Sequence, residues 1–198
     1  MTMLDVLSNE ISDQLITNNI INEKDKEIYV FGIYQLIGFV FNIISSVAIF
    51  LILGKLREGL VFSFSYFILR SYAGGFHSKS TFKCYIISIF LICGAVVFMN
   101  TVYNSVFLWG IYLIINLLIY LCSPIDTENK RLDDIERKVY GFKTKKILFV
   151  LLVLNVCLAI LHYSWINVSI ITAVLFEGVM LIIGIISNNL NRISKEVK

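Results

Sequence analysis

The chain reads VFGIYQLIGFVFNIISSVAIFLIL from residue 30 to residue 53, without one charged side chain. As an α-helix rising about 1.5 Å per residue, this run is long enough to cross the roughly 30 Å of hydrocarbon in a bilayer. Further apolar runs follow at 84–103, 106–122, 147–161 and 168–186. Because 58% of the residues are hydrophobic and the mean hydropathy is +0.81, a soluble domain is excluded. The single proline favours helices over a barrel. The sequence predicts an all-α, polytopic integral membrane helical bundle.

The segment 60–69 leaves the number of membrane segments open, because it is apolar but short. If it crosses the bilayer, the chain has six segments with both termini in the cytoplasm. If it is re-entrant, five spans leave the N-terminus outside, and we favour six. Basic residues gather at 123–146 and in the C-terminal tail, which the positive-inside rule places in the cytoplasm. Counting back two spans places Cys84 on the cytoplasmic side as well.

The N-terminal 28 residues differ from the rest and show no cleavable signal peptide. Their apolar side chains recur at three- and four-residue steps, which predicts an amphipathic helix on the bilayer or on the protein. The sequence thus divides into an interfacial segment at 1–28 and one transmembrane domain at 29–198. Within that domain we expect a cytoplasmic catalytic segment at 70–84 and a basic loop at 123–146. The apolar residues of the N-terminal helix are Leu4, Leu7, Ile11 and Leu15.

Residues 70–84, RSYAGGFHSKSTFKC, combine a histidine and a cysteine with a Gly-Gly break. Cysteine attacks as the thiolate, and His77 can take its proton near neutral pH. On one continuous helix His77 and Cys84 would lie about 10.5 Å apart, so we expect the chain to bend between them. Gly74 and Gly75 permit such a bend.

Cys84 is expected to open the next helix. Serine and threonine favour helix N-termini, so a helix that begins near Ser80 or Thr81 puts this cysteine in its first turn. There the positive end of the helix dipole, with Lys83 beside it, favours the thiolate. An incidental structural role for the histidine and cysteine stays open, because such residues are common at helix ends.

Metal and cofactor sites are not expected. A zinc site needs three or four ligands, and His77 and Cys84 supply two. The other cysteines have no spacing typical of a disulfide framework, and we expect them to be small apolar core residues. These are Cys93, Cys122 and Cys157.

Three charged residues have more than one interpretation. Arg70 directly follows an apolar run, where it would anchor the interface, or bind a carboxylate or stabilise an oxyanion at Cys84. Glu177 lies within the last apolar run and is expected to be protonated or paired. Its role is a structural contact with Arg70, a polar pathway or a third catalytic group. Asp126, after the only proline, would orient His77 or serve a turn.

Two motifs carry a resemblance over most of the chain. The first is Arg70 with Gly74-Gly75-Phe76-His77 before Cys84, and the second is SPIDTENK at 123–130. In this order, and in a chain of this size, they resemble the accessory gene regulator protein B family, the membrane endopeptidases of peptide quorum sensing in Gram-positive bacteria. The resemblance implies that His77 and Cys84 are the catalytic pair and that Arg70 and Gly75 matter for activity.

The resemblance also implies a reaction and partners. The family removes the C-terminal tail of a small membrane-bound precursor, keeps the remainder as a cysteine thioester, and passes it to an internal cysteine or serine to give a thiolactone or lactone. It implies an amphipathic precursor with an acidic tail, the bilayer and self-association as a homodimer, with no nucleic acid. Lys130 and Arg131 match a region tied to processing. The family often has proline after the asparagine-lysine pair, whereas Arg131 and Leu132 follow here, a departure that bears on peptide recognition.

Competing functions follow from the same residues. In a small transporter or peptide-export component, Arg70 and Glu177 would line a polar path, and His77 and Cys84 would be incidental. A membrane scaffold for a sensor kinase leaves the histidine and cysteine unexplained. We therefore favour a cysteine endopeptidase and cyclase of the cell membrane with its active site facing the cytoplasm.

Overall fold

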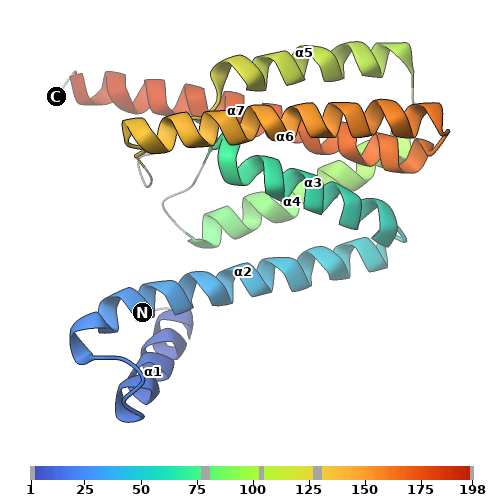
Figure 1. Cartoon of the computed structure of the whole chain (residues 1–198). Coiled ribbons are helices and arrows are strands. Elements are labelled where there is room, and N and C mark those ends of the chain that lie inside the picture. Colours follow the sequence, from blue (N-terminus) through green and yellow to red (C-terminus); the bar gives the residue numbers. More distant parts are fainter. Residues whose placement is uncertain (1–2, 77–80, 103–104, 127–130, 197–198) are drawn as a thin grey trace. The chain divides into compact units, whose positions relative to one another are not determined.

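The computed structural model describes residues 3–76, 81–102, 105–126 and 131–196. Within these ranges the chain is helical without a β-strand, and Figure 1 shows the helices in chain order. The predicted all-α class is confirmed. The helices are α1 (Met3–Thr17), η1 (Glu23–Asp25), α2 (Lys26–Ile52), α3 (Leu56–Ala73), α4 (Thr81–Thr101), α5 (Val106–Cys122), α6 (Asp134–Ile160) and α7 (Ser164–Glu196).

The chain forms two compact units, residues 1–48 and residues 49–198. In the first unit, Lys26 Nζ at the start of α2 lies 2.5 Å from Asp13 Oδ1 of α1. The predicted N-terminal helix is present over Met3–Thr17. Its interfacial position, and the predicted division of the chain after residue 28, stay predictions.

Three helical stretches in the described residues are long and apolar enough to cross a membrane: 23–52, 82–101 and 164–190. Helix α5 is equally apolar in character but shorter. Large apolar side chains along α2, such as Phe31, Leu36 and Ile44, are exposed, as expected of a lipid-facing helix. The membrane class is therefore supported, while the number of six segments stays a prediction.

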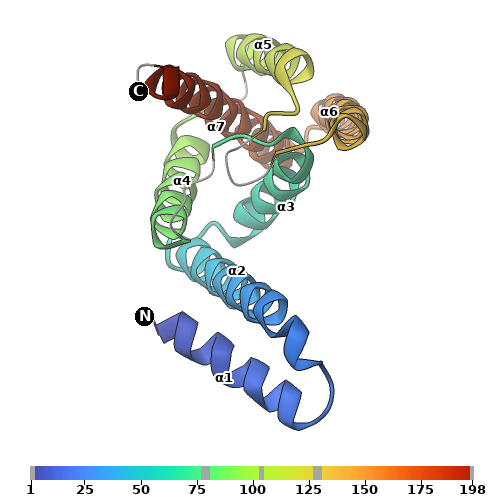
Figure 2. The ribbon, with the colours of Figure 1, turned by 90° about the vertical axis from the view of Figure 1, so that its left-hand side faces the viewer.

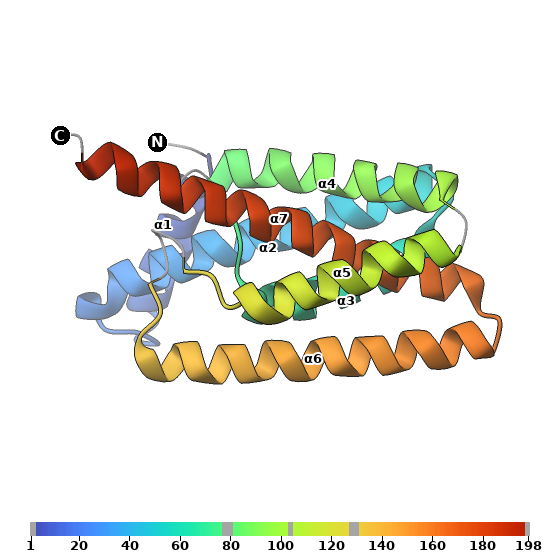
Figure 3. The same cartoon turned by 90° about the horizontal axis from the view of Figure 1, so that it is seen from above.

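Helix α7 is the centre of the second unit. It packs against α3, α4, α5 and α6, as Figure 2 shows, and Figure 3 shows the same helices lengthwise. One apolar cluster joins α7 to α3, α5 and α6 through residues such as Leu69, Tyr112 and Leu148. A second joins it to α4 and includes Phe62 and Val96. A segment that contacts α7 is thus bound to the most buried helix of the unit.

The predicted basic loop at 123–146 is wrong in its second half, because residues from Asp134 onward are helical. Asp133 caps this helix: its Oδ1 accepts a hydrogen bond from Glu136 N at 2.6 Å, and Asp133 N donates to Glu136 Oε2 at 3.3 Å. This capping box satisfies backbone groups that the first turn leaves free, and the lysines and arginines that follow are good helix formers. The basic side chains therefore lie on the first turns of α6.

Candidate active site

The glycine pair ends α3 and turns the chain. Gly74 and Gly75 have φ angles of +79° and +123°, a region that side chains rarely adopt. A Cβ on Gly74 would lie 2.4 Å from the Ile125 carbonyl oxygen, so the position also lacks space. Since α3 ends at Ala73 and α4 begins at Thr81, the predicted break between the two helices is confirmed. His77 itself lies outside the described residues.

Arg70 holds this turn from the last part of α3. Its Nη1 donates to the Gly74 carbonyl oxygen at 2.7 Å, and its Nη2 donates to the Phe76 carbonyl oxygen. A Cβ on Gly75 would lie 1.9 Å from Arg70 Nη1, so the guanidinium fits only against a glycine. The arginine is therefore packed against the turn, and its side chain is 13% exposed. The sequence predicted neither the contact with the turn nor this degree of burial.

Glu177 of α7 faces the same guanidinium. Its Oε1 lies 3.7 Å from Arg70 Nη1, and its side chain is fully buried. Neither of its carboxylate oxygens has a hydrogen-bond partner among the described residues. A buried carboxylate needs an opposite charge to offset its lost hydration, and Arg70 supplies it. The predicted pairing of Arg70 with Glu177 is confirmed.

The turn rests directly on α7. Phe76 N donates to the Met180 carbonyl oxygen at 3.0 Å. A Cβ on Gly184 would lie 2.8 Å from Phe76 N and 2.8 Å from the Gly75 carbonyl carbon. Neither α7 position was predicted from the sequence. A glycine within an apolar helix is the one signal available, because small residues let backbones approach closely in membrane proteins.

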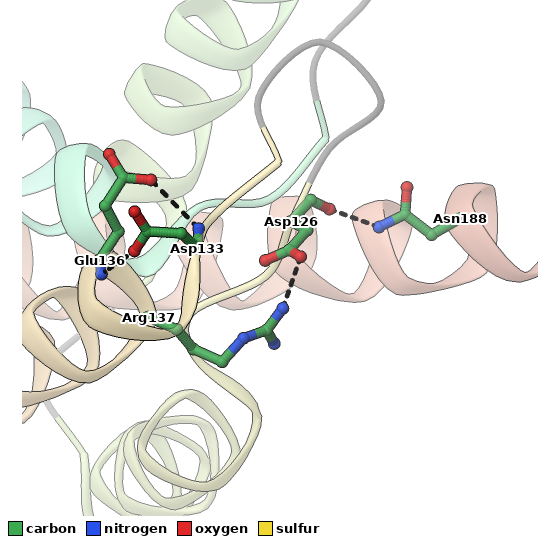
Figure 4. A network of polar contacts seen from close by, with 5 residues as sticks. All are labelled: Asp126, Asp133, Glu136, Arg137 and Asn188. Carbon is green, nitrogen blue, oxygen red and sulfur yellow. Dashed lines mark hydrogen bonds and ion pairs between the residues drawn. The ribbon is translucent and has the colours of Figure 1, made fainter.

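The second motif lies beside this turn. Ile125 N donates to the Ala73 carbonyl oxygen at 3.0 Å, and Gly74 and Ile125 form an isolated parallel bridge. On the other side of the motif, Asn188 Nδ2 of α7 donates to the Asp126 carbonyl oxygen at 2.5 Å, as Figure 4 shows. The two motifs of the sequence thus meet on one helix, and Asn188 is a further residue that the sequence analysis missed.

The Asp126 carboxylate points toward α6. Its Oδ2 lies 2.5 Å from Arg137 Nη2 (Figure 4). Its Oδ1 is buried and has no hydrogen-bond partner among the described residues. The predicted orientation of His77 by Asp126 stays a prediction, because the histidine lies outside the described ranges. Lys130 lies outside them too, whereas Arg131 is described and exposed.

Cys84 occupies the predicted place. It lies in the first turn of α4, which begins at Thr81, and its free thiol is partly exposed. Helical side chains lean toward the N-terminus, so we expect the thiol to lie near the N–H groups of the first turn, which lack intrahelical partners. The core assignment of the other cysteines is wrong for Cys122 and Cys157, which are exposed. Hydropathy does not separate core from lipid-facing positions, because lipid tails are as apolar as the bundle interior.

Tyr66 lies one turn before Arg70 on the same helix, α3. Its ring stacks on Phe62, with the ring centroids 5.7 Å apart. Nothing in the sequence singled out this tyrosine. The buried ion pair and the arginine-held turn belong to one site, and Cys84 lies at the start of the helix that follows this turn.

Comparisons with known proteins give one family. The model of a family described as accessory gene regulator B matches residues 8–185. An AgrB-like protein of Clostridium perfringens strain SM101 is 30% identical over an alignment of 176 residues, with 82% of this chain and 80% of the relative covered. A second, of strain 13, is 30% identical over 171 residues with the same shares. An AgrB-like protein of Listeria monocytogenes strain HCC23 is 29% identical over 127 residues, 62% of each chain. No solved structure matches.

Proposed function

The chain belongs to the accessory gene regulator B family, and from this premise we propose that it is a membrane-embedded cysteine endopeptidase of peptide quorum sensing. It removes the C-terminal tail of a small pro-peptide and promotes closure of the remainder into a thiolactone or lactone. The observation that carries the proposal is the position of Cys84, a free thiol in the first turn of α4. The preceding turn, which leads to His77, is fixed by Arg70.

The proposed reaction has two acyl transfers. His77 takes the thiol proton of Cys84, and the thiolate attacks the scissile carbonyl carbon. The C–N bond breaks, the tail leaves as an amine that receives the proton, and the N-terminal part stays on Cys84 as a thioester. An internal thiol or hydroxyl of the peptide then gives its proton to His77 and attacks this thioester, which closes the ring and breaks the bond to Cys84. The proton on His77 returns to the released Cys84 thiolate.

The proposed substrate is an amphipathic peptide with an acidic tail. Exposed cationic side chains lie on the first turns of α6 and just before it, where they would attract such a tail. The bilayer would hold the apolar part of the peptide near the site and raise its effective concentration. A cytoplasmic active site and self-association as a homodimer belong to the same proposal. The exposed cations are Arg131, Arg137, Lys138, Lys143, Lys145 and Lys146.

The test is the intact mass of the protein after co-expression with a candidate precursor. We expect a mass increase equal to the N-terminal peptide fragment, removed by hydroxylamine and absent from Cys84→Ala. Cys93→Ala is the matched control, because Cys93 is a second free, partly exposed cysteine of α4. We expect this control to keep the adduct. If an authentic precursor stays uncut and no adduct forms, the transporter hypothesis replaces the protease.

A further inference from the structure

One guanidinium connects the turn before His77 to the central helix. Arginine has five N–H donors in a rigid planar fork and accepts no hydrogen bond. In this site the donors of Arg70 bind the carbonyl oxygens of Gly74 and Phe76, and Nη1 also faces Glu177 Oε1 at 3.7 Å. The position of the fork therefore sets the positions of both carbonyl groups.

The fork stays in the bundle because of Glu177. Arg70 is a cation with a 13% exposed side chain, and Glu177 is the carboxylate that pairs with it in the described part of the chain. When one partner of a buried pair is removed, the other is left as an uncompensated charge. A long cationic side chain then moves its charge to the membrane interface. Loss of the Glu177 charge is thus expected to withdraw Arg70 from the turn.

Withdrawal of Arg70 would free the end of the turn that precedes His77. The turn then depends on the bond from Phe76 N to the Met180 carbonyl oxygen and the bond from Ile125 N to the Ala73 carbonyl oxygen, and without the arginine we expect both bonds to open more often. It loses both bonds from the arginine, and its glycines adopt several backbone conformations readily. Because Phe76 directly precedes His77, a displaced turn displaces the histidine. A misplacement of about 1 Å costs on the order of 100-fold in rate.

We propose that Glu177 is a positioning residue of the reaction, which acts through Arg70 on the turn at Gly74–Phe76. The proposal rests on the proposed function for its catalytic readout. Glu177 is fully buried and faces the guanidinium, so we expect its effect on the reaction to pass through Arg70.

The kinetic test compares Glu177→Gln, which removes the charge at nearly constant shape, with Glu177→Asp, which keeps it. For Glu177→Gln we expect kcat per folded protein to fall about 10- to 100-fold, with KM within about twofold of wild type. Glu177→Asp is expected to recover part of kcat. Addition of Glu177→Gln to Arg70→Met is expected to cause no further loss, because both changes remove the same anchor.

A matched control separates positioning from folding. Thr172→Val changes another buried polar residue of α7, whose hydroxyl bonds only to the Val168 carbonyl oxygen among the described residues. We expect its kcat to equal that of wild type. A merely structural role for Glu177 would lower the yield of folded protein while kcat per folded molecule stayed constant. That result, or full additivity with Arg70→Met, would overturn the proposal.

Hydrogen exchange gives a readout that needs no substrate. In nanodiscs, Glu177→Gln should speed exchange of the Phe76 amide at least tenfold and leave the amides of α5 unchanged. Unchanged exchange at Phe76 would overturn the proposal even if the wild type processes a precursor. Faster exchange in a protein whose wild type cuts no precursor would support the anchoring of the turn and reject the protease instead.

Discussion

Gly184→Ala tests the contact between α7 and the glycine turn with one methyl group. The new Cβ would lie 2.8 Å from Phe76 N and 2.8 Å from the Gly75 carbonyl carbon. All of these atoms belong to the backbone, so no side chain can rotate away. Ordinary contact begins at 3.4 Å, and the turn or the helix must therefore retreat by about 0.6 Å.

The expected loss is larger for activity than for stability. Alanine is favoured over glycine within a helix by about 0.8–1.0 kcal/mol, whereas overpacking costs about 1–3 kcal/mol. The two terms leave a net destabilisation of about 0–2 kcal/mol, which allows the protein to fold. A displacement of about 0.6 Å next to His77 is expected to lower kcat about tenfold, because about 1 Å costs about 100-fold.

The assay is the initial rate of precursor cleavage in proteoliposomes, normalised to folded protein. Gly110→Ala is the matched control: it is a glycine of α5 with nothing within 4 Å of a Cβ. We expect this control to keep the wild-type rate. Hydrogen exchange of the Phe76 amide should be faster in Gly184→Ala and unchanged in Gly110→Ala. The reason is that the bond from Phe76 N to the Met180 carbonyl oxygen would lengthen only in Gly184→Ala.

Equal rates for Gly184→Ala and Gly110→Ala would refute the reasoning. So would a lower rate with unchanged exchange at Phe76, because the loss would then not pass through the turn.

Three further predictions concern the neighbouring contacts. Gly74→Ala, with a Cβ 2.4 Å from the Ile125 oxygen and a φ of +79°, is expected to abolish the thioester adduct in intact-mass measurements while the protein still inserts. Asn188→Ala removes the bond to the Asp126 carbonyl oxygen and is expected to slow cleavage several-fold, unlike Asn189→Ala at the exposed neighbouring position. Asp133→Ala removes the cap of α6 and is expected to cost about 1 kcal/mol locally, seen as faster exchange at 134–137 without loss of the adduct.

The sequence was sufficient to predict a structural feature where that feature depends on one particular residue type. A glycine pair predicts the bend after α3, and a cysteine that follows serine and threonine predicts a place in the first turn of α4. A lone glutamate in an apolar run predicts a buried partner, and Arg70 is that partner. At the glycine pair and at Glu177 an alternative side chain would be sterically or electrostatically costly.

The contacts that join the two motifs were beyond sequence reasoning. They use the backbone groups of Ala73, Met180 and Asp126 as hydrogen-bond acceptors, and every residue type has such a group. Asn188 gave no signal because asparagine near the end of a helix is ordinary. The helical part of the predicted basic loop was missed for a different reason, since charged residues indicate solvent exposure more than they indicate a loop.

The bond between Ile125 N and the Ala73 carbonyl oxygen bears on the construction of chimeras within this family. Residues 123–131 include the positions that the family resemblance connects with processing, so they are the natural segment to exchange between relatives of different peptide specificity. Here that segment is fastened to the turn that leads to His77 on one side and to Asn188 of α7 on the other. Both bonds use backbone groups of the segment, so a graft of different sequence keeps them only if its backbone follows the same path at 125–126. A graft with a different backbone path there is expected to disturb the turn that leads to His77 as well as the specificity.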